Sequence, residues 1–201
     1  MIHSIVPLAV LEAIRNIDTP VEDGLGEFAA ELLLKRFGLS ATVQTQLVEY
    51  EALVRRDARV PAAHVEALLR LVGRRPDADL VFADAGRRAA RRAVRRAFIG
   101  VRLLARLAPN TLGDAAARRA ARVVLGGELG REGRLPVVRV RDALALRATP
   151  DGAACVLYSA AFAELVRLLM RFESAMLHTT CRKSGVDRCE WRAALPDPRH
   201  Y

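Results

Sequence analysis

Apolar residues recur at helical spacing along the first two thirds of the chain. The valines and isoleucines at positions 6, 10, 14 and 17 follow one another at intervals of three or four residues, which predicts a helix over residues 5–17. Glycine or proline follows several later segments of this kind, as expected where helices end. The same pattern predicts helices at 25–36, 60–72, 79–107 and 112–125, and helical or mixed structure at 40–56.

The period changes after Pro136. Apolar residues at 138, 140, 144 and 146 alternate with arginines, which predicts a strand that runs to residue 147. The charged, glycine-containing segment 126–133 is predicted to be a loop. The remaining pattern predicts a helix at 155–172, strands at 175–181 and 188–194, and a turn at 184–187 between those strands. This order of elements predicts an α+β fold, in which N-terminal helices precede a small antiparallel sheet backed by helices.

Composition narrows the range of partners and locations. With 201 residues, 52% of them hydrophobic, the chain can bury the core of one domain. A net charge of +9 is typical of proteins that bind anions or nucleic acid. However, every basic residue except Lys35 and Lys183 is arginine, and aromatic residues are few and not interleaved with them, which argues against nucleic-acid binding. No run of 18 apolar residues and no signal segment is found, so we expect no transmembrane helix and a cytoplasmic location.

The three cysteines all lie in the last quarter of the chain, together with a histidine. They form the pattern Cys155-x22-His178-x2-Cys181-x7-Cys189. Thiolates and imidazole are the ligands that zinc prefers, and four of them complete a tetrahedron. The pattern therefore predicts a zinc-bound C-terminal hairpin, with zinc in a closed, structural role. Buried thiols or a disulfide remain the alternative.

Arginines dominate one face of the predicted helix at 79–107. They form two adjacent rows at i,i+4 spacing, which is typical of a solvated helix face. A more specific interpretation is an anion-binding rim or a docking patch for an acidic enzyme partner, because a guanidinium group can bind a carboxylate through two parallel hydrogen bonds. A pocket between this helix and the helix at 155–172 would then hold an apolar ligand. Its predicted binding residues are Arg87, Arg91, Arg95, Phe98, Tyr158 and Phe162.

Signatures of enzymes are missing from the sequence. It contains no Gly-x-Gly-x-x-Gly, no Walker loop, no Gly-x-Ser-x-Gly and no His-Glu-x-x-His. The histidines at positions 3 and 64 have no partner at a motif spacing. We therefore predict no catalytic residues and expect binding rather than redox chemistry.

Three segments give the C-terminal half a resemblance to the 4-vinyl-reductase domain family. They are Asp-Ala-Gly-Arg-Arg at 84–88, Cys-Val-Leu-Tyr at 155–158, and the ending at 178–191, which contains Cys-x-x-x-Gly-x-x-x-Cys-Glu-Trp. The resemblance spans about residues 80–194 and is closest to the branch of bacteriochlorophyll synthesis. His178 stands where the family usually has an acidic residue, and both can bind zinc.

The resemblance implies a fold related to subunits of vesicle-transport particles and a role in binding small molecules. It predicts a helical region at 1–78, a ligand-binding domain at 79–195, a tail at 196–201, and a homodimer formed through the N-terminal helices. The implied function is a carrier or accessory protein for a hydrophobic, carboxylate-bearing ligand, namely a tetrapyrrole. The alternatives are a sensor module for a small aromatic or lipid-like ligand, and a vinyl reductase acting on a divinyl tetrapyrrole.

Overall fold

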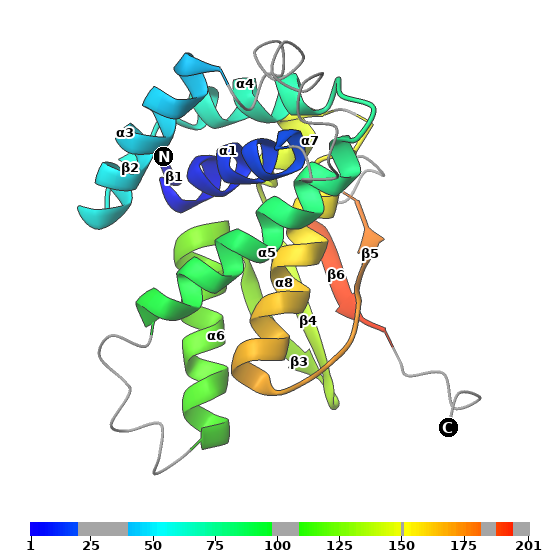
Figure 1. Cartoon of the computed structure of the whole chain (residues 1–201). Coiled ribbons are helices and arrows are strands. Elements are labelled where there is room, and N and C mark those ends of the chain that lie inside the picture. Colours follow the sequence, from blue (N-terminus) through cyan, green and yellow to red (C-terminus); the bar gives the residue numbers. More distant parts are fainter. Residues whose placement is uncertain (20–39, 98–108, 150, 182–187, 195–201) are drawn as a thin grey trace, which may run out of the picture.

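Figure 1 shows the computed structural model, which describes residues 1–19, 40–97, 109–149, 151–181 and 188–194. The predicted helix at 25–36, the turn at 184–187 and the end of the predicted helix at 79–107 lie outside these residues. The described elements are seven helices and two small antiparallel sheets, so the predicted α+β class is confirmed.

Helices form most of the chain before residue 126. They are α1 (Ile5–Asp18), α3 (Ala41–Arg55), α4 (Ala62–Val72), α5 (Ala78–Ala97) and α6 (Pro109–Leu125). Two short strands, β1 (Ile2–His3) and β2 (Arg59–Val60), pair beside them. Nearly all side chains of α1 are buried, so this helix is a core element inside the chain.

The second sheet belongs to the C-terminal half and has the strand order β3-β4-β6-β5. Its elements are β3 (Glu128–Glu132), β4 (Leu135–Val140), β5 (Met176–Thr180) and β6 (Cys189–Ala193), with α7 (Leu144–Ala148) and α8 (Cys155–Met170) between β4 and β5. Figure 1 shows α8 lying between the sheet and α5. Along β6 the residues at 189, 191 and 193 are buried against these helices. On the opposite face Glu190 pairs with Arg139 of β4, with 2.8 Å between Oε2 and Nε.

Two sequence predictions were wrong in this region. The segment predicted to be a loop contains β3, an edge strand in which only Leu129 is buried. An edge strand with one buried side chain has no apolar alternation to detect. The predicted strand beyond residue 140 ends there, and Leu144 begins α7. Its residues 144, 145 and 148 are buried on one helical face.

Helices α5 and α8 approach each other closely at Gly86. A β carbon at this position would lie 2.3 Å from the carbonyl oxygen of Leu157 and 2.9 Å from the backbone nitrogen of Ala161. Both distances are well inside van der Waals contact, so only glycine allows the two backbones to meet here. At Gly86 the two helices leave no space between them for a ligand.

We expect Gly86→Ala to lower the free energy of unfolding by about 1–3 kcal/mol, because the new methyl group must push α8 away. Alanine favours helix, so without the clash this substitution would stabilise the protein. Urea denaturation measures the difference. Gly130→Ala in β3 is the control, since a β carbon added at Gly130 would have no neighbour within 4 Å. Equal stability of both variants would contradict the close approach.

Candidate metal centre and arginine face

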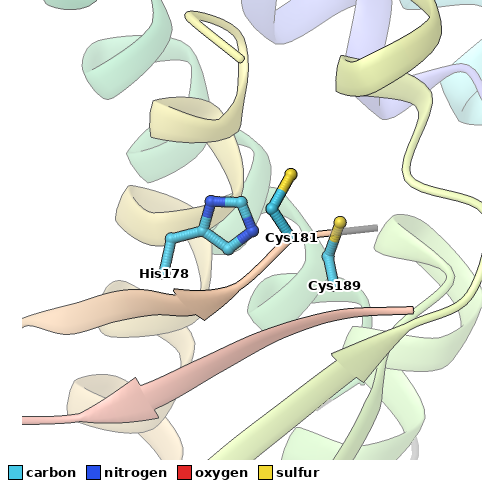
Figure 2. Close-up of side chains that lie close together, drawn as sticks. All are labelled: His178, Cys181 and Cys189. Atoms are coloured by element: carbon cyan, nitrogen blue, oxygen red, sulfur yellow. The ribbon is translucent and has the colours of Figure 1, made fainter. Parts of the chain in front are cut away.

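Three of the four predicted metal ligands lie together where β5 ends and β6 begins. One ligand atom from each of His178, Cys181 and Cys189 lies within 4.8 Å of the other two. Antiparallel pairing produces this arrangement: Thr180 pairs with Glu190, so the cysteines follow as the next neighbours across the strands. Figure 2 shows the imidazole ring turned toward the two sulfur atoms.

The imidazole of His178 has the protonation state and the open nitrogen that a metal ligand needs. Burial lowers its pKa, and a hydrogen bond with the backbone of Thr180 opposes this shift. The ring is therefore neutral at pH 7. Nε2 is buried and has no hydrogen-bond partner. An unpaired buried nitrogen is costly, and a metal ion beside the two thiols would satisfy it.

Cys155 lies beside this group but is not a member of it. It is the first residue of α8 and is buried. Burial raises the pKa of its thiol to about 12, and ionisation of Cys189 or Cys181 would raise it further. Three sulfur atoms thus lie close enough to interact electrostatically. None of the three cysteines, all within the described residues, forms a disulfide.

A cluster of aromatic rings packs against the imidazole ring of His178. Trp191 is fully buried and stacks on His178, with 4.5 Å between ring centroids. Its other neighbours are Tyr158, stacked at 5.3 Å, and Phe162, edge-on at 5.5 Å. The indole nitrogen donates a hydrogen bond to Ser159 Oγ at 3.0 Å. Tyr158 and Phe162, predicted to line a ligand pocket, therefore belong to the core behind the metal group, and Phe98 lies outside the described residues.

The arginines of α5 divide into two rows with different surroundings. One row is paired inside the chain: Arg88 with Asp84, Arg92 with Glu12, and Arg96 with Asp57. The other row consists of exposed side chains, namely those of residues 87, 91 and 95. The sequence showed both rows but not their partners, because two of the three acidic residues lie far away along the chain.

The exposed row borders a shallow depression on α8. Glu164, which is buried, accepts hydrogen bonds from Arg91 Nε at 2.7 Å and from Arg167 Nε at 2.8 Å. The depression has a volume of about 300 Å³. Arg87 is the member of the exposed row that lines it, together with Ala160, Ala163, Glu164, Arg167, Glu173 and Ser174. Within the described residues no carboxylate pairs with Arg87. This guanidinium is open to an external anion.

A histidine–aspartate pair near the N-terminus was missed by the sequence analysis. His3 Nε2 lies 2.9 Å from Asp57 Oδ1, and Nδ1 accepts a hydrogen bond from the backbone N–H of Ile5. The pairing of β1 with β2 brings these residues together across 54 positions, a separation that no motif marks. Both ring nitrogens are engaged, so His3 is not available as a base toward its neighbour Ser4. The pair anchors the start of α1.

No family model, curated protein or solved structure matches this chain. The resemblance to the 4-vinyl-reductase family thus stays a prediction. In the described part of the chain, no helix has the length and apolar character to cross a membrane.

The paired arginines make stability depend on pH through Glu164. Hydrogen bonds from Arg167 and then Arg91 lower the pKa of Glu164 to about 2, against the opposing effect of burial. Its contribution is present above the unfolded pKa of about 4.3 and disappears as the pH falls toward 2. We expect Glu164→Gln to cost about 1–2 kcal/mol at pH 6 and much less at pH 2.5.

Urea denaturation at both pH values tests this expectation. Glu173→Gln is the matched control, because Glu173 is exposed and lies near Arg167, which also pairs with Glu164. A loss at pH 6 that persists unchanged at pH 2.5 would show that the Glu164 carboxylate does not cause it.

Proposed function

We propose that this chain is a zinc-stabilised binding module that carries a hydrophobic, carboxylate-bearing ligand. The observation that carries the proposal is the group of His178, Cys181 and Cys189, whose ligand atoms lie within 4.8 Å of one another. Two thiols and an imidazole select zinc over magnesium or calcium, which prefer oxygen ligands. Cys155, whose thiol interacts with both other cysteines, is the candidate for the fourth position.

A structural role for the metal follows from where its ligands lie. They join the end of β5, the start of β6 and, with Cys155, the start of α8. A four-ligand zinc site has no position for a substrate, and its binding energy contributes directly to folding. The metal would hold the hairpin against α8, where Trp191 is buried.

The exposed arginines of α5 support the proposed class of ligand, a hydrophobic molecule that bears a carboxylate. Exposed Arg87 borders a depression lined by the methyl groups of two alanines. Glu164 and Glu173 also line it and act on Arg167, so Arg87 is the guanidinium that a carboxylate ligand would meet. Such a surface suits a carboxylate joined to an apolar body. The depression is open and small, so it would hold the carboxylate-bearing edge of a large planar ligand. We propose a tetrapyrrole of bacteriochlorophyll synthesis, as the resemblance implies, and a carrier or accessory role beside a pathway enzyme.

The metal is tested by elemental analysis of freshly purified, reduced protein. We expect close to one zinc per chain, because three ligands lie together, the histidine among them is neutral, and Cys155 is the candidate for the fourth position. His178→Gln, Cys181→Ser and Cys189→Ser should lose the metal and lower the melting temperature. His64→Gln, an exposed histidine on α4, is the matched control and should keep the metal. Substoichiometric zinc in the unaltered protein would contradict the proposal.

The ligand is tested by titration with protoporphyrin IX. We expect a shift of its absorption spectrum with a Kd on the order of 1 µM, or about −8 kcal/mol. Arg87→Ala should weaken binding about tenfold, because one charge-assisted hydrogen bond is lost. Arg119→Ala, an exposed arginine on α6, is the control. No spectral shift would favour the sensor alternative, and reduction of a divinyl substrate by pure protein with NADPH would favour the reductase.

A further inference from the structure

A small cavity lies where the N-terminal elements meet the C-terminal ones. Its volume is about 80 Å³. Residues of β1, α1, β2 and α4 line one side of it, and the end of α6 with the starts of α7 and α8 lines the other. It shares no lining residue with the depression beside Arg87 and none with the metal group. Ligand sites occur preferentially at such junctions between parts of a protein.

The buried lining of the cavity is mostly apolar, and its buried polar side chains are His3 and Tyr158. Val6, Leu69 and Leu157 are buried side chains of its wall. Tyr158 is also a buried lining residue, and a hydrogen bond of its hydroxyl group with the backbone of Leu144 opposes the effect of burial on its pKa. Burial raises that pKa far above neutral pH, so Tyr158 keeps its proton and can donate it. The wall therefore combines an apolar surface with one hydrogen-bond donor.

Two guanidinium groups lie at the outer part of the cavity. Arg59 and Arg122 are exposed, and no carboxylate within the described residues pairs with either of them. Arg59 donates a hydrogen bond to the carbonyl oxygen of Val123, which places it beside Arg122 at the end of α6.

Two other titratable side chains of the lining, Asp142 and His3, add no net charge. Asp142 Oδ2 lies 2.6 Å from Arg147 Nη1, so the two charges offset each other. Burial is the main cause that lowers the pKa of His3, so its ring is neutral. The carboxyl end of α6 adds about half a negative charge, which is less than the two positive charges of the arginines. The cavity therefore presents a net positive charge to a ligand.

We propose that this cavity binds a short-chain monocarboxylate. The carboxylate would meet Arg59 and Arg122, and the aliphatic chain would lie against the apolar wall beside Tyr158. The volume is about half that of the roughly 150 Å³ cavity known to receive benzene, so it suits a short aliphatic chain whose carboxylate lies toward the exposed arginines, as in propionate. This site shares no residue with the proposed metal group or with the depression proposed for the tetrapyrrole.

The position of Tyr158 supplies a direct readout. Its ring stacks on Trp191, which is the only tryptophan of the chain. A ligand that contacts Tyr158 should therefore change the tryptophan fluorescence, whereas an anion bound elsewhere on the basic surface should not.

Titration of the whole purified protein with sodium propionate tests the proposal by calorimetry and tryptophan fluorescence. Propionamide has the same size without the charge and is the ligand control. We expect saturable binding of propionate and none of propionamide. Arg122→Met should raise the Kd about tenfold or more, since a charge-assisted hydrogen bond is lost. Arg119→Met, three residues earlier on the same helix and outside the cavity, should leave the Kd unchanged. Circular dichroism establishes that both variants are folded.

Three results would overturn the proposal. The first is the absence of heat and of a fluorescence change at 20 mM propionate, about fourfold above the weak Kd of roughly 5 mM that such a small ligand can be expected to have. The second is equal binding of propionamide, which would exclude recognition of the charge. The third is an unchanged Kd in both Arg59→Met and Arg122→Met, which would place the ligand elsewhere. Failure here leaves the zinc content and the porphyrin titration unaffected.

Discussion

The burial of Trp191 is the interaction on which the C-terminal half of the structure depends. Antiparallel pairing places it opposite Val138 on one side and His178 on the other, so one side chain spans the centre of the sheet. Its ring is fully buried against Tyr158 and Phe162 of α8. A buried tryptophan typically contributes about 3–5 kcal/mol relative to alanine, which is a large part of the net stability of a domain. The position of every nearby functional group follows from this packing.

The metal group illustrates how the register of strands determines chemistry. Pairing of Thr180 with Glu190 makes Cys181 and Cys189 neighbours across the strands, and stacking on Trp191 fixes the ring of His178 beside them. The register shifts by one residue between His178 and Thr180, which is a β-bulge. Side chains alternate along a strand, so without this shift His178 and Cys181, three residues apart, would lie on opposite faces of the sheet. The stack of His178 on Trp191 and the group of ligands therefore occur together because of this bulge.

Much of the fold could be predicted from apolar periodicity, but features set by tertiary contacts could not. Helices α1, α4, α6 and α8 carry clear stripes, and their predicted positions agree with the structure. Strand β3 has only Leu129 buried, so its pattern carried no signal. The four ligand candidates were visible as residue types. However, the sequence did not distinguish Cys155 from the three residues that form the group in the structure. The partners of Arg92 and Arg96 lie 80 and 39 residues away, and such distances leave no trace in a local pattern.

The same stack of rings connects the metal group with the cavity between the N-terminal and C-terminal elements. His178 contacts Trp191, Trp191 contacts Tyr158, and Tyr158 lines the cavity. Protein interiors are close-packed, so a displaced ring displaces its neighbour. Any ion that fixes the imidazole would thereby also fix the tyrosine, and would reduce the conformational entropy that a ligand in the cavity must overcome. In this arrangement a metal could favour binding at a distance without touching the ligand, because the contacts of His178 with Trp191 and of Trp191 with Tyr158 connect two sites that share no lining residue.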